Sequence, residues 1–190
     1  MNKWLIALIS VVVVIVIIFS SFMGTYNNLQ ALDENVNSNW AQVENQLQRR
    51  SDLIPNLVNT VKGYAAHEKN VFVDIADARS KLSGAIQTKD IKGINQANTQ
   101  FSGALSRLLA ISENYPQLKA DQNFIALQDE IAGTENRLSV ARKDYNDSVQ
   151  TINATIRMFP TNIIANMAGI KEREYFKVEE SAKQAPTVKF

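Results

Sequence analysis

One residue pair in the sequence has side chains that could act together in acid–base chemistry. His67 is the only histidine among the 190 residues, and Glu68 follows it directly. A histidine beside a carboxylate can transfer a proton near neutral pH. However, no serine or threonine nucleophile motif accompanies the pair, and adjacent positions of a helix point about 100° apart. The favoured interpretation is therefore a structural pair at the end of a helix, because polar side chains serve packing and hydrogen bonding more often than catalysis.

The composition excludes most other kinds of reactive site. The chain has no cysteine, so it has no disulfide, no thiolate nucleophile and no cysteine-ligated metal. One histidine cannot supply the paired histidines of zinc proteases or the two Glu-x-x-His motifs of dimetal bundles. The seven glycines are scattered and form neither a P-loop nor a dinucleotide-binding pattern. We therefore expect no catalytic residue, no metal and no cofactor, and a protein that is not an enzyme.

Four charged residues lie in or beside the apolar stripes of the expected helices: Arg50, Glu68, Glu135 and Arg142. A buried charge is costly unless it is paired, so these residues predict arginine–carboxylate bridges that fix how the helices align. The sequence does not show which residue pairs with which. The alternative places these charges at the solvated edge of each stripe, because long side chains can extend to water.

Long helices are needed to position these residues, and the composition favours an all-α fold. Four prolines are few for a chain of this length. After Gly24, apolar residues recur in steps of three and four, as they do along a helix with one buried face. Pro55 interrupts this pattern, and we expect a kink or a break there because proline removes a backbone hydrogen bond. Turns are expected around Lys89 and at Tyr115-Pro116.

The clearest apolar stripe runs along the later part of the chain and stops at Pro160. Its alternating steps of three and four resemble a coiled-coil seam. Its members are Phe124, Leu127, Ile131, Thr134, Leu138, Ala141, Tyr145, Val149, Ile152, Ile156 and Phe159. A shorter amphipathic segment around Ile163 and Met167 follows and is closed by Gly169. Narrow stripes must be buried against each other, so we expect an antiparallel bundle of three or four long helices over residues 24–178 and a disordered tail over 179–190.

Residues 4–23 are expected to form a transmembrane anchor. This segment has no charge and no proline, and twenty helical residues rise about 30 Å, the thickness of a hydrocarbon core. A cleaved signal peptide is the alternative, but the apolar run is longer than usual and lacks a pair of small residues two positions apart near its end. Lys3 precedes the anchor and Arg49 is the first basic residue after it. This distribution favours a cytoplasmic N-terminus and an extracytoplasmic helical domain.

Several short stretches of sequence form a specific set. The most specific stretch runs from Arg49 to Val58, with Arg49-Arg50-x-Asp52-Leu53-Ile54-Pro55, and is followed by Lys62-Gly63-Tyr64-Ala65-x-His67-Glu68. The others are Tyr26-Asn27-x-Leu29, Trp40 with Val43, Ala78-Arg79, Tyr115-Pro116-x-Leu118-Lys119-Ala120, Glu135-Asn136-Arg137, Ala141-Arg142-x-x-Tyr145-Asn146, Phe159-Pro160 and Tyr175-Phe176. Together these stretches resemble the LemA family of bacterial membrane proteins, and the resemblance extends from the anchor to about residue 178. It implies a single N-terminal membrane helix and a helical bundle, and it brings no catalytic or cofactor residues.

The expected partners follow from charge and surface composition. Twenty basic residues balance nineteen acidic ones, which gives no basic surface for nucleic acid. Near-zero net charge and a long helix with more than one apolar face favour self-association. The leading hypothesis is therefore a non-enzymatic scaffold that self-assembles at the bacterial plasma (inner) membrane. The alternative is an envelope binding or sensing module that captures another protein or a lipid.

The seam charges and the family-like stretches define a set of candidate structural or interaction residues. They are Arg49, Arg50, Asp52, Pro55, Tyr64, His67, Glu68, Glu135, Arg142 and Tyr145. The binding hypothesis predicts that Arg49→Ala or Tyr64→Ala leaves the protein folded but abolishes capture of an envelope partner.

Overall fold

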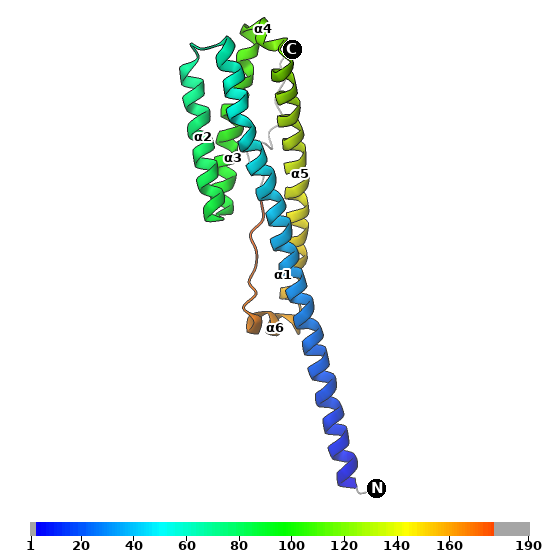
Figure 1. The fold of residues 1–190 in the computed structure, drawn as a ribbon. Helices are drawn as coiled ribbons and strands as arrows, with labels where there is room; N and C mark the ends of the chain where they lie inside the picture. The colour runs from blue at the N-terminus through cyan, green and yellow to red at the C-terminus, as the bar shows by residue number, and fades with distance from the viewer. Residues whose placement is uncertain (1–2, 177–190) are drawn as a thin grey trace, which may run out of the picture. The chain divides into compact units, whose positions relative to one another are not determined.

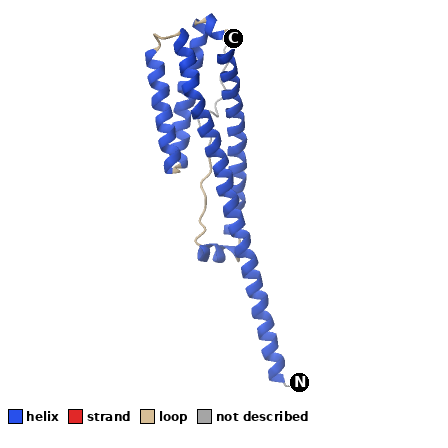
Figure 2. Cartoon of the chain, viewed as in Figure 1, coloured by secondary structure: helices blue, strands red, loops and turns tan. Residues whose placement is uncertain are grey.

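The computed structural model describes residues 3–176, and within this range it contains helices and loops but no strand (Figure 2). The elements are α1 (Lys3–Tyr64), α2 (Lys69–Thr88), α3 (Ile91–Ala110), the 3₁₀ turn η1 (Ile111–Asn114), α4 (Pro116–Lys119), α5 (Gln122–Arg157) and α6 (Thr161–Ala168) (Figure 1). This confirms the expected all-α fold, with an N-terminal apolar helix followed by a bundle. Four of the helices are long, namely α1, α2, α3 and α5. The tail expected at 179–190 lies outside the described residues.

The chain divides into two compact units. Among the described residues, the first comprises 3–39 and 146–174, and the second comprises 40–145 and 175–176. We call them the anchor unit and the bundle unit. Helices α1 and α5 each contribute one part to the anchor unit and another to the bundle unit.

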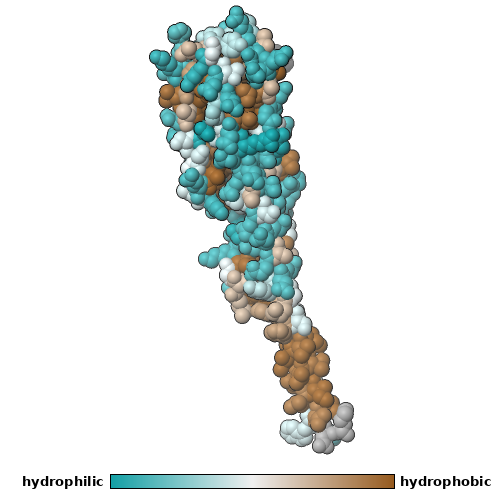
Figure 3. Space-filling model, viewed as in Figure 1, coloured by the Kyte–Doolittle hydropathy of each residue, from teal (hydrophilic) through white to brown (hydrophobic). Residues whose placement is uncertain are grey.

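Helix α1 begins as an apolar segment and continues into a polar one as a single element of 62 residues. Its N-terminal part is long and apolar enough to cross a membrane, and none of that part is buried within the structure. Figure 3 shows it as a stretch of hydrophobic surface. An exposed apolar helix of this length needs a non-aqueous environment. The chain is therefore a single-pass, membrane-associated protein.

Helix α1 contains Pro55 without ending there, so of the kink or break expected at this proline the break is absent. A proline inside a helix costs about 3 kcal/mol, because it removes one hydrogen bond and crowds the preceding turn. Ile54, Leu57 and Val61 flank it and are all at most 2% exposed. Each fully buried aliphatic side chain contributes about 1.5–3 kcal/mol. Burial on both sides of the proline therefore outweighs its local cost.

The core of the anchor unit forms from apolar side chains of α1, α5 and α6. Its buried members are Leu29, Val36, Val149, Ile152, Ile156, Ile164 and Ala165. Arg173 connects the elements, because its Nη2 lies 2.7 Å from Asp33 Oδ1 of α1, while its backbone N–H donates to Asn153 Oδ1 of α5 at 2.9 Å. Phe159 was expected to close the apolar seam but is 81% exposed. Helix α5 ends at Arg157, so helical spacing no longer directs Phe159 toward the core.

The bundle unit contains the helical hairpin of α2 and α3, which pack against each other. Lys89 adopts the left-handed conformation at the end of α2, and the Asp90 side chain accepts a hydrogen bond from the Lys92 N–H to cap α3. The fully buried large side chains of this unit are Leu47, Leu57, Ile75, Leu82, Ile94, Phe101, Leu108, Leu118, Phe124 and Leu138. They come from α1, α2, α3, α4 and α5, so the unit is built around one shared core.

Candidate functional site

A buried arginine of α1 forms the polar centre of the bundle unit. Arg50 is 5% exposed, and its Nη1 lies 2.5 Å from Glu135 Oε2 of α5. The same nitrogen is 3.2 Å from Ser102 Oγ and 3.4 Å from Asn98 Oδ1, both on α3. The Glu135 contact is a close ion pair whose angle falls outside hydrogen-bond geometry. Burial lowers the pKa of Arg50, and the Glu135 carboxylate opposes that effect. One of the arginine–carboxylate bridges expected from the sequence is therefore present.

Arg142 follows Glu135 by seven residues on α5 and interacts electrostatically with the Glu135 carboxylate. Burial lowers the pKa of Arg142, Glu135 raises it, and the positive charge of Arg50 lowers it. The guanidinium carbon of Arg142 lies 5.5 Å from the centre of the Phe176 ring. Arg50 and Arg142 are thus both largely buried near one carboxylate. This arrangement stabilises the packing of the helices. It lacks the acid and base of a catalytic pair.

Three aromatic side chains pack together in the bundle unit. Trp40 stacks on Phe176 with ring centres 5.5 Å apart, and Tyr145 meets both rings edge-on at 5.5 and 5.4 Å. Edge-to-face and stacked pairs at these separations are favourable beyond the area they bury. Tyr145 is 3% exposed, so it serves here as a core residue.

The remaining charged candidates of α1 form surface ion pairs. Arg49 Nη2 lies 2.7 Å from Glu130 Oε1 of α5, with the arginine side chain 58% exposed. Asp52 lies 3.9 Å from Arg79 of α2, whose Nε also donates to the Ser51 hydroxyl at 3.2 Å. Exposed pairs of this kind each contribute about 0–1 kcal/mol. These pairs therefore add little to the stability of the fold.

Tyr64 ends α1 and donates a hydrogen bond from its hydroxyl to Asp121 Oδ2 at 2.8 Å. Asp121 also accepts from the Phe124 N–H at 3.0 Å, which makes it the N-cap of α5. The Tyr64 hydrogen bond is the main cause of the lowered pKa of Asp121, and Asp121 in turn raises the pKa of Tyr64. Sequence reasoning did not select Asp121, although an aspartate directly before an apolar helical stripe is a recognisable capping signal.

His67 and Glu68 lie in the turn between α1 and α2. His67 is exposed, and its side chain makes no hydrogen bond within residues 3–176. Glu68 precedes α2 without capping it through its side chain, and it makes no ion pair in the described part of the chain. The structure therefore places neither residue beside Arg50 and Glu135. Within residues 3–176, no group of three or more metal-ligating side chains is close enough together to hold a metal ion.

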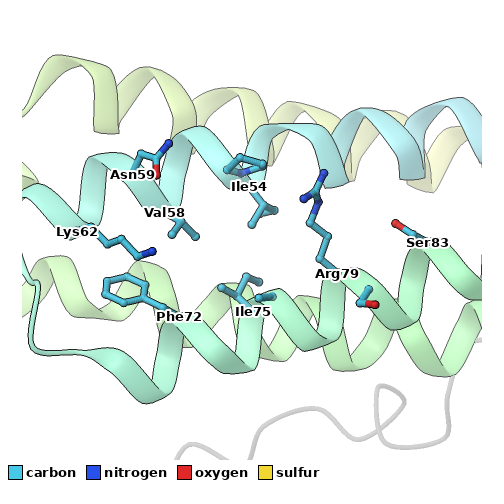
Figure 4. Close-up of a pocket in the computed structure, with 11 residues that line it drawn as sticks. Ile54, Val58, Asn59, Lys62, Phe72, Ile75, Arg79 and Ser83 are labelled. Carbon is cyan, nitrogen blue, oxygen red and sulfur yellow. The ribbon is translucent and has the colours of Figure 1, made fainter.

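The bundle unit contains a groove between α1 and α2, with a volume of about 570 Å³ (Figure 4). Its apolar lining includes Ile54, Val58, Phe72 and Ile75, and Pro55 completes the α1 side. Its other lining residues are Asn59, Lys62, Ala76, Arg79, Ser80 and Ser83. We call this feature the α1–α2 groove.

Two cations flank the apolar lining of the α1–α2 groove. Lys62 Nζ lies 5.3 Å from the centre of the Phe72 ring, and the Arg79 side chain extends toward α1 (Figure 4). On the α2 side, the small residues Ala76, Ser80 and Ser83 follow one another in steps of four and three. An apolar channel with small residues on one wall and cations along it fits a helix that carries acidic residues.

The arrangement described so far defines a class of protein, namely a single-pass membrane protein with a helical-bundle domain. The LemA family model matches residues 39–190, and this chain belongs to the LemA family. Magnetosome protein MamQ 2 of Paramagnetospirillum magneticum is 28% identical over 197 residues, covering 92% of this chain and 72% of the relative. Magnetosome protein MamQ of Magnetospirillum gryphiswaldense is 26% identical with the same coverage. Protein LemA of Metamycoplasma hominis is 24% identical over 166 residues, covering 86% and 74%.

Proposed function

We propose that this protein is a membrane-anchored, non-enzymatic scaffold whose helical domain holds other protein chains beside the membrane. The observation that carries the proposal is the α1–α2 groove, because its lining is largely apolar and two cations flank it. The anchor concentrates the protein at the bilayer, and a groove of this kind holds a helix without chemistry. The candidate catalytic pair, His67 and Glu68, lies in a turn outside this groove.

The first occupant we propose for the α1–α2 groove is a helix of a second copy of the chain. Self-association follows from the near-neutral charge of the sequence and from its long helices. A contact between the groove of one copy and a different surface of the next can continue into rings or open arrays. The relatives named magnetosome proteins are named for a cellular structure and not for a reaction, which agrees with a structural role.

The second occupant we propose is a helix of another envelope protein. The specific observation is that Lys62 and Arg79 place positive charge along the groove. An acidic amphipathic helix would satisfy both the charge and the apolar lining. This version keeps the scaffold role but makes the chain a capture module for a different protein.

Photocrosslinking from inside the α1–α2 groove separates these occupants. Benzoylphenylalanine would replace Ala76, an exposed residue that lines the groove, in the full chain in native membranes. The matched control replaces Val73, which is 58% exposed on α2 but does not line the groove. An adduct of two identical chains supports self-assembly, and an adduct with another protein supports the capture module. Absence of any adduct specific to position 76 contradicts the proposal.

We also propose the orientation of the protein, with its N-terminus in the cytoplasm and its helical domain outside the plasma membrane. The support is the position of Lys3 before the apolar helix and of Arg49 far beyond it. The anchor is retained in this proposal. A cysteine introduced at Ser38 in this cysteine-free chain should react with a membrane-impermeant maleimide in intact cells. Reaction only after lysis would reverse the orientation.

A further inference from the structure

Four exposed apolar side chains lie together near the end of α5 and along α6. Met158 is 60% exposed, Phe159 81%, Ile163 52% and Met167 73%. Among the described residues of the anchor unit, the other large exposed apolar side chains all belong to the membrane-spanning part of α1. We call these four residues the α6 patch. Apolar side chains this exposed usually mark a surface that another apolar phase covers.

The local structure holds the α6 patch in place. Helix α6 buries Ile164 and Ala165, which leaves Ile163 and Met167 exposed one turn apart. Gly169 ends the helix with φ +71°, a left-handed conformation that glycine adopts without strain. Four residues later, Arg173 is bound to both α1 and α5. The patch is therefore a fixed part of the anchor unit.

The position of the α6 patch relative to the anchor follows from Arg173. Its hydrogen bonds to Asp33 of α1 and Asn153 of α5 hold these two residues within reach of one arginine. From Asn153 to the end of α5 is four residues, or about 6 Å toward the anchor. Asp33 follows Met23, where the apolar run stops, by ten residues or about 15 Å, so the end of α5 lies on the order of 10 Å beyond Met23.

The lipid headgroup layer occupies about 5–7 Å on each side of the hydrocarbon core. The α6 patch follows the end of α5, so methionine and phenylalanine side chains there lie within reach of this layer. Figure 1 shows α6 beside α1 at the end of α5, and Figure 3 shows pale brown surface in this region next to the brown anchor. The region around α6 therefore lies close to the apolar surface of the anchor.

The charges around α6 agree with a lipid surface. Lys171 is exposed just beyond the helix and makes no ion pair among the described residues, so it is free to reach a lipid phosphate. Arg157 is held by Glu172, with its Nε 2.7 Å from the carboxylate. We propose that α6 lies in the headgroup layer of the bilayer and gives the protein a second membrane contact beside its anchor. Lipid would cover the α6 patch, and the resulting two-point attachment would fix the tilt of the anchor unit.

Depth-dependent fluorescence quenching tests this proposal on the full chain. Because the chain has no cysteine, Met167→Cys and Phe159→Cys each provide one labelling site for an environment-sensitive dye. Both positions are exposed, so neither substitution removes a core residue. Ser38→Cys is the control, since it is exposed on α1 about 22 Å beyond Met23. The protein would be reconstituted in vesicles of phosphatidylcholine and phosphatidylglycerol.

We expect dyes at positions 167 and 159 to emit at shorter wavelength than the dye at position 38. Lipids with a spin label near the headgroup should quench them several-fold more strongly than they quench the dye at position 38. Two results overturn the proposal. One is emission and quenching at 167 and 159 that match position 38. The other is blue-shifted emission without lipid quenching, which would show that protein covers the α6 patch.

Discussion

Arg50 and Glu135, 85 positions apart in the sequence, lie 2.5 Å from each other in the bundle unit and join α1 to α5. The arginine is almost fully buried, whereas the glutamate side chain is 46% exposed. The Arg50 guanidinium is therefore part of the core, whereas the Glu135 side chain is partly in contact with water. The Glu135 carboxylate also interacts electrostatically with Arg142, so it opposes the charge of both arginines.

Glu135→Gln should lower the free energy of unfolding by about 1–3 kcal/mol, because it leaves the buried Arg50 without its ionic partner. The cost is below that of a fully buried pair, since solvent partly reaches position 135. A urea titration of the full chain in detergent micelles, followed by circular dichroism, measures the change. Glu130→Gln is the matched control, and its exposed pairing with Arg49 predicts a loss below about 1 kcal/mol. Equal losses for both variants would contradict this ranking.

The Tyr64–Asp121 hydrogen bond should give the bundle unit a pH dependence at both ends of the scale. The pKa of Asp121 is lowered, so its contribution is present above pH about 4 and is lost as pH falls through the folded-state pKa. The pKa of Tyr64 is raised, so its contribution is present below pH about 10 and is lost as pH rises through its own folded-state pKa.

Tyr64→Phe removes that hydrogen bond and should move the pKa of Asp121 upward toward its ordinary value. Part of the lowering should remain, because the Phe124 N–H still donates to Asp121. Carboxyl chemical shifts followed against pH by NMR give this pKa directly. Tyr175→Phe serves as the control tyrosine substitution. An unchanged Asp121 titration in Tyr64→Phe would show that the bond does not form in solution.

Asn153→Ala should release the segment after α6 from the anchor unit. The Asn153 side chain is 4% exposed, donates to the Arg173 carbonyl and accepts from the Arg173 N–H, both at 2.9 Å. Alanine leaves both backbone groups without that partner, so hydrogen exchange of the Arg173 amide should accelerate by on the order of tenfold or more. Exchange measured by mass spectrometry tests this, with the exposed Asn35→Ala as control. Similar exchange in both variants would mean that other contacts hold the segment.

Local patterns of the sequence were sufficient to predict the helical fold. The apolar run from Trp4 to Met23 and the stripe that follows it both predict helix, and both lie within α1. Pro116, Pro160 and Gly169 lie at or next to helix ends, as their backbone restrictions require. At Pro55 the sequence allowed a kink or a break, and the break is absent because buried neighbours on both sides of the proline stabilise the continuous helix.

The candidate site was less accessible from sequence because it depends on distances between helices. Spacing placed Arg50, Glu135 and Arg142 near apolar stripes, but only the alignment of α1 with α5 shows that two arginines share one carboxylate. The α1–α2 groove depends on how far those helices stand apart, and no periodicity encodes that distance. The α6 patch was missed because Phe159 and Met167 keep helical spacing with core residues although the chain turns between them.

The mass of the protein complex in lipid nanodiscs, taken directly from native membranes, tests the scaffold proposal most directly. Light scattering on the full chain should give a protein mass well above the 21.2 kDa of one chain. Ala76→Trp, which fills the α1–α2 groove from an exposed position, should reduce the mass to that of one chain, whereas Val73→Trp should not. A wild-type mass equal to one chain, or one that Ala76→Trp leaves unchanged, would contradict a scaffold that holds protein through this groove.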